Sequence, residues 1–257
     1  METVAPTIKS ARELDIMREA GRIAATALKR MGELVRPGVT TLELDQEAER
    51  TILSRTATCE FNGYHGFPAN VCSSVNEQVV HGIPSKDVVL TQGDIVGLDV
   101  GARYRNYIGD TARTFAVGEP NEEVRALLDV TEKCLYAAIE VIGPGRKLWE
   151  VSESVQKLAA KHGYGLVREY AGHGIGTRMH EDPQVPNYVD MSSRYAELTL
   201  RPGMVICVEP MLNVGVADVK VLDDGWTVVT ADGKLSAHFE HTIAVTEDGA
   251  EILTIPE

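Results

Sequence analysis

The sequence lacks the features that mark membrane and secreted proteins. No stretch of its 257 residues approaches the roughly 18 consecutive apolar residues that a membrane-spanning helix needs. Residues 1–15, METVAPTIKSARELD, contain no apolar core of the kind that signal peptides carry. We therefore expect a cytoplasmic protein that has no membrane partner.

Positive charge is also scarce. The chain has 25 Lys and Arg against 38 Asp and Glu, a net charge of −13, and no run of basic residues interrupts this acidic excess. Nucleic acid is not expected as the main ligand, because phosphate binding needs a basic surface. No GxGxxG, GxxxxGKS or GxxxxGKT motif follows any expected strand, which argues against a nucleotide-binding fold.

The cysteines do not have the spacing of a disulfide framework or a zinc site. They lie far apart and include no CxxC pair, and a chain of 257 residues can bury a core without disulfide bonds. Cys207, in the apolar run MVICVE, is predicted to be a small buried apolar side chain. We expect free thiols at Cys59, Cys72, Cys134 and Cys207.

Apolar residues recur at helical spacing in two pairs of segments. The first pair covers 10–35 and 40–53, with Thr41 as the expected cap of its second helix. The second pair covers 121–142 and 147–163. A glycine-containing turn, RPG or GPG, separates the helices of each pair.

Segments rich in β-branched residues predict an antiparallel sheet. Short turns such as DDG and ADGK between them favour hairpins. With the helix pairs, this pattern predicts an α+β protein, an antiparallel sheet with two helix pairs on one face. The expected strands are 94–101, 106–117, 204–212, 226–232 and 237–246.

The chain contains two similar halves. RPGVTTLEL at 36–44 aligns with GPGRKLWEV at 143–151, and QGDIVGLDVG at 92–101 aligns with the segment RPGMVICVEP, with Gly93 opposite Gly203, at nearly the same offset. A duplicated helix–helix–strand unit explains both alignments. A shared helix–turn pattern without duplication is the alternative.

The alignment places one acid at the same position in each half. Asp99 and Glu209 both lie six residues after the glycine of their repeat, in the apolar segments IVGLDVG and MVICVEP. A hairpin after Asp99 is expected to bring Asp110 back beside it, and a hairpin through 223–234 to bring Glu240 near Glu209. For either strand acid alone, a buried Arg or backbone donors that hold the carboxylate are the structural alternative.

Four carboxylates in one sheet centre would repel one another by roughly 4 kcal/mol for each close pair at an effective dielectric of about 20. A multivalent cation removes this repulsion. Oxygen-rich sites with one imidazole suit Mn, Fe, Co or Zn, and bridging carboxylates hold two such ions about 3.5–4 Å apart. His173 is the expected imidazole, because Gly172, Gly174 and Gly176 let the chain approach a crowded centre.

Several longer motifs surround these residues: HGIP (81–84), DVGARYRNYIGDTARTF (99–115), GHGIGTRMHEDPQVPNY (172–188), VEPML (208–212), DGWTV (224–228) and FEHTIAVTEDGAEILT (239–254). Together they resemble the type I methionine aminopeptidases, metallopeptidases of the pita-bread fold. The resemblance extends from about residue 8 to residue 255.

The resemblance implies a fold and an activity. The fold would be a curved antiparallel sheet with two pseudo-symmetric helix pairs on its outer face, in a single catalytic domain, 1–257, with halves at about 10–117 and 121–250. The activity would be metal-dependent hydrolysis that removes the N-terminal methionine of nascent polypeptides, with a preference for a small second residue. A monomer that contacts the ribosome transiently is also implied.

The resemblance implies two divalent ions, Co, Mn, Fe or Zn, held by Asp99, Asp110, His173, Glu209 and Glu240. Asp110 and Glu240 would bridge the two ions, and Glu209 would also move the proton of the attacking water. Two histidines that are unremarkable by spacing, His81 in a turn and His180 beside acids, also take catalytic roles. His180 would donate to the scissile carbonyl oxygen, and His81 would contact the peptide beyond that bond and relay a proton.

An apolar cup for the methionine side chain is implied as well, since a thioether gains from contacts with aromatic rings. The expected cup residues, with His81 at the edge and His180 beside the substrate, are Cys59, Tyr64, Phe67, Cys72, Trp226 and Phe239. Two positions depart from close relatives. Phe67 stands where Tyr is frequent, and His238 stands where Gln is usual, on the strand face shared with Glu240.

Three other hypotheses compete with this one. X-Pro peptidases of the same fold have a substantial N-terminal domain, whereas about ten residues precede the first expected helix. Type II methionine aminopeptidases have a helical insertion for which the interval from 180 to 209 leaves no room. Non-catalytic proteins of this fold lack some metal ligands, and all five are present here.

Overall fold

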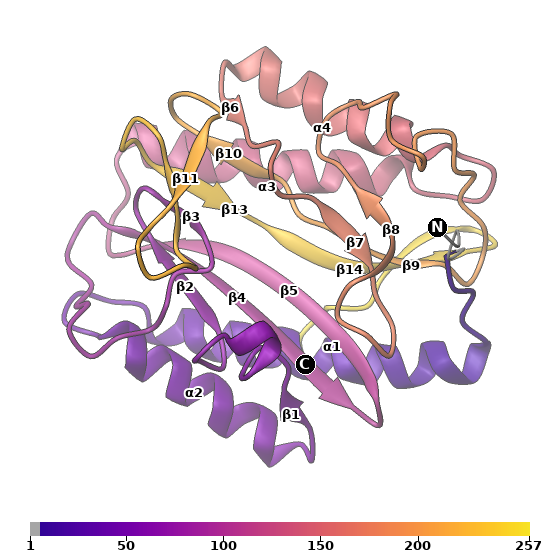
Figure 1. Cartoon of the computed structure of the whole chain (residues 1–257). Helices are drawn as coiled ribbons and strands as arrows, with labels where there is room; N and C mark the ends of the chain where they lie inside the picture. Colours follow the sequence, from indigo (N-terminus) through magenta and orange to yellow (C-terminus); the bar gives the residue numbers. More distant parts are fainter. Residues whose placement is uncertain (1–5) are drawn as a thin grey trace.

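The computed structural model describes residues 6–257 (Figure 1). Each end of the four predicted helices lies within one residue of its expected position. No helix in the described part of the chain combines the length and apolar character needed to cross a membrane. The helices are α1 (Ala11–Leu34), α2 (Thr41–Ser54), α3 (Glu122–Val141) and α4 (Leu148–His162).

The start of α2 corrects one prediction. Thr40, not Thr41, is the cap, because the Thr40 hydroxyl accepts a hydrogen bond from the backbone N–H of Glu43 at 3.2 Å. The hydroxyl of Thr41 donates instead to the carbonyl of Ser85 at 3.1 Å. The sequence carried a signal for Thr40, because Glu43 lies three residues after it and forms a capping box, whereas Leu44 lies three residues after Thr41.

The strands are more numerous than expected, and most are shorter, although β4 (Ile95–Tyr104) continues three residues beyond the expected end at 101. All of the expected strands form, but several short strands at the edges and in the loops were not predicted. The strands are β1 (Thr58–Cys59), β2 (Cys72–Val75), β3 (Gln78–Val80), β4 (Ile95–Tyr104), β5 (Tyr107–Ala116), β6 (Gly165–Leu166), β7 (Gly172–Gly174), β8 (Glu181–Val185), β9 (Val205–Val208), β10 (Met211–Asn213), β11 (Val219–Val221), β12 (Val228–Thr230), β13 (Ser236–His238), β14 (Glu240–Thr246) and β15 (Gly249–Ile252).

The main sheet has nine strands within the described residues, and every pairing in it is antiparallel. Its order is β1-β4-β5-β14-β9-β7-β8, with β2 also paired to β4 and β15 to β14. Two small sheets, β13-β10-β6 and β11-β12-β3, lie beside it. The expected hairpin of Asp99 and Asp110 is confirmed as β4 and β5, in which Gly101 lies opposite Asp110.

Two predicted strands are interrupted beside their acids. The segment 204–212 divides into β9 and β10 at Glu209 and Pro210, since proline has no N–H for a strand ladder. The segment 237–246 divides into β13 and β14 at Phe239. Glu209 therefore directly follows one strand, and Glu240 begins another.

The route that brings Glu240 to Glu209 also differs from the prediction. Residues 223–234 do not join the two acids as one hairpin, because β12 within them pairs with β3 and β11 in a separate sheet. The acids approach because β9 pairs directly with β14, with Val208 opposite His241. The expected proximity is thus correct, but it arises from a different strand pair.

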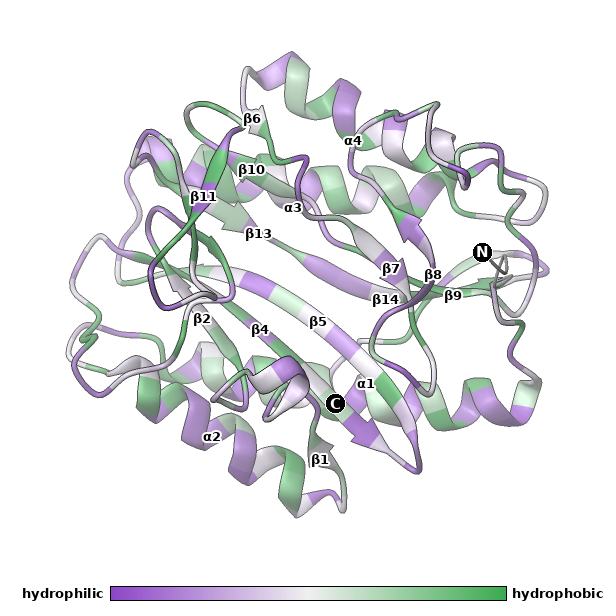
Figure 2. Ribbon diagram, viewed as in Figure 1, coloured by the Kyte–Doolittle hydropathy of each residue, from purple (hydrophilic) through white to green (hydrophobic). Residues whose placement is uncertain are grey.

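Both helix pairs cover the convex side of the curved sheet (Figure 1). Hydrophobic and hydrophilic positions alternate around each helix, so one side of each can face the sheet (Figure 2). One apolar core lies among α1, α2 and β4, and a second lies among α3, α4, β9 and β14. The α+β architecture with two helix pairs on the outer face is confirmed, while the origin of the halves 10–117 and 121–250 by duplication stays a prediction.

Candidate metal centre and substrate pocket

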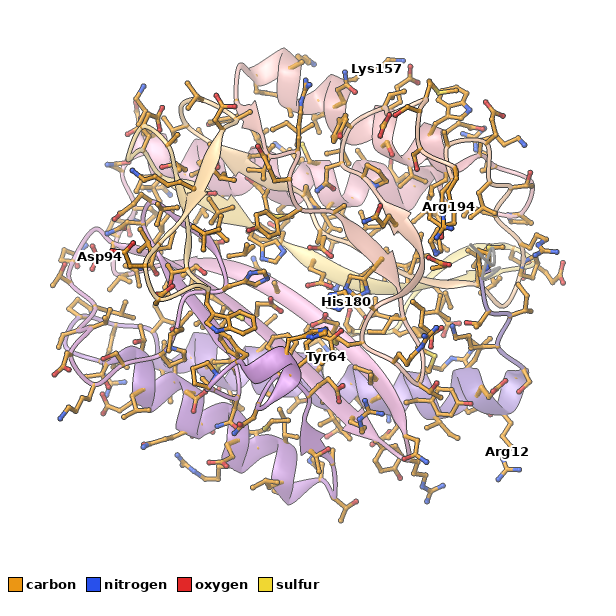
Figure 3. The ribbon with its side chains drawn as sticks, viewed as in Figure 1. Arg12, Tyr64, Asp94, Lys157, His180 and Arg194 are labelled. Carbon is orange, nitrogen blue, oxygen red and sulfur yellow. The ribbon has the colours of Figure 1, made fainter. Side chains whose placement is uncertain are left out.

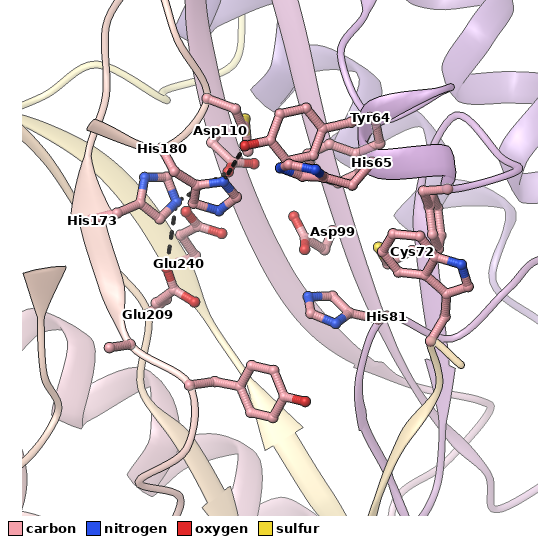
Figure 4. Close-up of a pocket in the computed structure, with 16 residues that line it drawn as sticks. Tyr64, His65, Cys72, His81, Asp99, Asp110, His173, His180, Glu209 and Glu240 are labelled. Atoms are coloured by element: carbon pink, nitrogen blue, oxygen red, sulfur yellow. Dashed lines mark hydrogen bonds and ion pairs between the residues drawn. The ribbon is translucent and has the colours of Figure 1, made fainter. Parts of the chain in front are cut away.

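The concave face of the sheet contains a pocket of about 270 Å³. All five expected metal ligands line it, together with both expected catalytic histidines (Figure 4). Four of the six expected cup residues also line it. The eleven expected residues of all three kinds that line the pocket are Tyr64, Phe67, Cys72, His81, Asp99, Asp110, His173, His180, Glu209, Trp226 and Glu240.

Strand alternation places the acids on one face. Asp110 lies opposite Gly101, two residues from Asp99, so both aspartates project from the same side of the β4–β5 pair. Glu240 is paired with Ala112, two residues from Asp110, and so faces the same side. Four carboxylates from different strands consequently meet at the centre of the sheet.

These carboxylates lack lysine or arginine partners, and two of them are buried, while Asp99 and Glu209 are partly exposed. Asp110 and Glu240 are only 3% and 2% exposed, and one carboxylate oxygen on each, as well as one on Asp99, has no hydrogen-bond partner. Within residues 6–257, no Lys or Arg forms an ion pair with any of the four acids. The alternative that a buried arginine holds these carboxylates is therefore excluded for the described residues. The unpartnered buried oxygens fit a bound cation instead.

Burial also shifts the pKa values of the acids and of His173 in the pocket. Burial raises the pKa of Asp99 to about 7. Burial and the neighbouring acids raise the pKa values of Asp110, Glu209 and Glu240 well above their usual range. Burial lowers the pKa of His173 to about 3, so its imidazole is neutral and can act as a ligand.

His173 is oriented by its own chain. Its Nδ1 lies 3.0 Å from the carbonyl oxygen of Gly174, and because a carbonyl only accepts, Nδ1 carries the proton. The free Nε2 faces the acids, 3.9 Å from Asp110 Oδ2 and 3.7 Å from Glu209 Oε1. These separations are too long for hydrogen bonds but suit two ligand atoms that share one ion at about 2.0–2.2 Å from each.

The sulfur of Cys207 lies in this cluster too. It belongs to a buried group with Asp110, His173 and Glu240, whose potential ligand atoms all lie within 4.8 Å of one another. The predicted burial of Cys207 is confirmed, since its side chain is inaccessible to solvent. Its place beside the acids was not predicted, and its position two residues before Glu209 was the available signal.

The two auxiliary histidines reach the pocket from different loops. His180 is exposed on the pocket wall, where its Nδ1 is hydrogen-bonded to the Tyr64 hydroxyl at 2.7 Å (Figures 3 and 4). The rings of His180 and His173 lie 4.3 Å apart. His81 packs edge-on against Tyr170, with ring centroids 5.4 Å apart, on another side of the pocket.

The apolar side of the pocket differs in part from the expected cup. Phe67 and Trp226 pack edge to face at 5.2 Å, and Tyr64 and Cys72 lie beside them in the pocket lining. Lining residues that were not predicted are Phe61, His65, Tyr170, Ala171 and Met179. Of these, Phe61 and Met179 belong to the apolar cluster around Phe67 and flank predicted residues in the sequence, which was the available signal.

Two expected cup residues lie elsewhere. Cys59 is paired with Ala102 in the sheet, and its side chain packs against the core under α1 and α2. Phe239 directly precedes Glu240 and so faces the opposite side of the strand, where it is buried in the core under α3 and α4. His238, which was expected on the strand face of Glu240, is buried with its Nε2 unpartnered.

Comparison with known proteins identifies the protein family of this chain. The model of metallopeptidase family M24 matches residues 15–247. This chain belongs to metallopeptidase family M24. Its buried cluster of potential ligands agrees with divalent metal binding, the chemistry from which the family takes its name.

Relatives in family M24 match nearly the whole chain. Methionine aminopeptidase 1 of Bacillus subtilis is 48% identical over 96% of this chain and 98% of its own length. A methionine aminopeptidase of Clostridium acetobutylicum is 47% identical over 97% and 99%. The solved methionine aminopeptidase of Thermotoga maritima has a TM-score of 0.94 and 42% identity, covering 97% of this chain and 99% of that one.

Other M24 structures share the fold but are longer. Prolidase from Pyrococcus furiosus has a TM-score of 0.74 and 26% identity, and the match covers 97% of this chain but only 66% of the prolidase. The pita-bread fold expected from the sequence is confirmed by these structures.

Metal loading at pH 7 is expected to release protons. Because burial raises the pKa of Asp99 to about 7 and the pKa values of the other three acids well above their usual range, the metal-free pocket holds protons that a cation must displace. Calorimetric titration of Mn²⁺ into chelator-treated protein, in buffers of different ionisation enthalpy, measures this release. A binding heat that is independent of the buffer would contradict the protonated state of the pocket.

Proposed function

We propose that this chain is a type I methionine aminopeptidase, which removes the N-terminal methionine of nascent polypeptides and prefers a small second residue. The observation that carries the proposal is the joining of two unlike environments in one pocket of about 270 Å³. One end is lined by buried carboxylates and an imidazole, and the other by Phe67, Trp226 and neighbouring apolar side chains. A peptide N-terminus with an apolar first side chain fits both ends.

For the metal centre, we propose two divalent ions, Co, Mn, Fe or Zn. Oxygen donors with one imidazole suit these ions, and unpartnered oxygens on Asp99, Asp110 and Glu240 support their binding. Ions bound here would supply a Lewis acid for the scissile carbonyl and would lower the pKa of a water molecule towards neutrality. The residues that would hold these ions are Asp99, Asp110, His173, Glu209 and Glu240.

Side chains of this protein are proposed to carry out the proton transfers of the reaction. Glu209 is the proposed proton carrier, which takes a proton from the attacking water and delivers it to the departing amine. Its place in the pocket lining beside the other acids and His173 supports this role.

His180 is proposed to stabilise the scissile carbonyl oxygen as it gains negative charge. If the Tyr64 hydroxyl donates to Nδ1 across their 2.7 Å contact, the proton of the neutral ring lies on Nε2, which can then donate to that oxygen. His81 is proposed to contact the peptide beyond the scissile bond and to relay a proton. Its edge contact with Tyr170 narrows the pocket there, which supports a small second residue.

The proposed cup for methionine is formed by Tyr64, Phe67, Cys72 and Trp226, to which we add Phe61 and Met179. Cys59 and Phe239 are left out because they pack in the two cores. Aromatic edges and a thioether wall suit the polarisable sulfur of methionine. We further propose that the protein acts in the cytoplasm as a monomer and contacts the ribosome transiently.

Hydrolysis of X-Pro peptides is the competing activity within this fold. The chain spans 98% of the Bacillus subtilis methionine aminopeptidase but only 66% of the Pyrococcus furiosus prolidase. This difference in coverage favours the methionine aminopeptidase.

The test of the proposed function compares Met-Gly-Met-Met with an X-Pro peptide. After chelator treatment, protein reloaded with Co²⁺ or Mn²⁺ is expected to release methionine from the first peptide and to leave the second intact, while protein kept in chelator is inactive. Chromatography of the products measures both reactions. Absence of metal-dependent methionine release would refute the proposal.

Variants of Glu209 and His180 separate a metal ligand from a residue that acts on the substrate. Glu209→Gln removes the proton carrier, and we expect kcat to fall by about 10²-fold or more. His180→Ala is expected to lower kcat by about 10²–10³-fold, as for loss of one donor to a developing oxyanion, without loss of metal. Near-normal turnover of Glu209→Gln, or loss of a metal equivalent in His180→Ala, would contradict the roles proposed for them.

A further inference from the structure

A segment that the proposed function does not use connects the start of the chain to the loop of His180. Residues 7–10, the N-terminal strap, lie against the turn that precedes β9, where the backbone N–H of Lys9 donates to the carbonyl of Gly203 at 2.7 Å. The strap ends at Ser10, whose backbone N–H donates to Glu13 and whose hydroxyl caps α1. The strap is thus fixed by hydrogen bonds at Lys9 and Ser10.

The side chain of Lys9 points into the protein. Its Nζ lies 2.9 Å from Glu181 Oε2, and the two side chains are only 5% and 4% exposed. Thr7 adds a second donor, since its hydroxyl lies 2.7 Å from the same oxygen and is itself hydrogen-bonded to Lys9 Nζ. A buried ion pair of this kind is interdependent, because removal of one partner leaves the other charge unpaired and away from water.

The other oxygen of Glu181 holds the loop between β7 and β8. Oε1 accepts hydrogen bonds from the backbone N–H groups of Thr177 at 3.0 Å and Arg178 at 3.2 Å. Gly176 makes this approach possible, because a Cβ atom there would lie 2.6 Å from Glu181 Oε1 and 2.8 Å from Lys9 Cε. The carboxylate of Glu181 therefore connects the strap to residues 176–180.

His180 comes directly before Glu181 and is exposed, so core packing does not fix its ring. Its one hydrogen bond in the structure is to Tyr64, and it also contacts the ring of His173. The position of its backbone is therefore set by the buried residues on either side, Met179 and Glu181. Of these two residues, Glu181 is the one whose carboxylate pairs with Lys9 of the strap.

We propose that Lys9 and Glu181 are positioning residues for peptide hydrolysis: the N-terminal strap holds the loop 176–180 so that His180 faces the scissile carbonyl. The proposal rests on the role proposed above for His180. It assigns a function in the reaction to a segment 172 residues away in the sequence from the acid that it binds.

The main test is Lys9→Met, which removes the ammonium but keeps an unbranched side chain. Displacement of a catalytic group by about 1 Å costs about 10²-fold in rate, so we expect kcat for Met-Gly-Met-Met to fall by about 10–10²-fold. KM and the number of bound metal ions should stay as in the wild type. Hydrogen exchange at the amides of Thr177 and Arg178 should become faster, because their acceptor is no longer held.

Two further variants keep the test decisive. Lys157→Met breaks an exposed ion pair with Glu153 on α4, far from His180, and should change neither kcat nor exchange in the loop (Figure 3). Thr7→Val removes one donor to Glu181 and should lower kcat by a smaller factor. It replaces Lys9→Met if that variant fails to fold.

Wild-type kcat in a folded Lys9→Met protein, or a fall in kcat that accompanies loss of metal, would overturn the proposal. A change in thermal stability without change in kcat or amide exchange would overturn it as well. An inactive wild type would instead refute the proposed aminopeptidase activity. In that case, unchanged exchange at Thr177 and Arg178 in Lys9→Met would still show that the strap does not hold the loop.

Discussion

The mutual repulsion of four carboxylates in one buried pocket is the constraint on which the rest of the structure depends. No Lys or Arg within residues 6–257 pairs with Asp99, Asp110, Glu209 or Glu240, and three of the four carry an unpartnered oxygen. Such a group of charges persists only if protons or a multivalent cation neutralise it. The raised pKa values of the acids and the neutral imidazole of His173 are two consequences of the same burial.

The fold brings these charges together through rigid strands rather than loops. Asp99 and Asp110 project from one hairpin, while Glu209 and Glu240 stand at the ends of β9 and β14, where two strands are interrupted. The helix pairs on the convex side supply two apolar cores that support the sheet from behind. The proposed substrate contacts, in contrast, come from segments outside the main sheet that carry Tyr64, His81 and His180, and the strap is proposed to hold the last of these segments.

Much of this could be predicted from the sequence because the pattern is local. Helical spacing located all four helices, and the acids of the two halves indicated a cation site before any fold was known. The predictions were wrong where the choice lay between two adjacent residues for one position in the structure. Phe239 was expected in the cup although strand alternation turns it away from the side of Glu240, and Thr41 was expected as a cap in place of Thr40.

Contacts between segments that are distant in the sequence could not be predicted from local sequence patterns. The pairing of Lys9 with Glu181, the place of Cys207 beside the acids and the packing of Cys59 under α1 and α2 depend on how strands are ordered in the sheet. Nothing in the spacing of these residues specifies that order.

The most direct test of the central claim is anomalous diffraction from crystals of the protein loaded with Mn²⁺, collected on either side of the metal absorption edge. The account predicts anomalous density in the pocket within coordination distance of His173 Nε2 and of carboxylate oxygens from the four acids. Metal-specific density elsewhere, with the pocket empty, would contradict it.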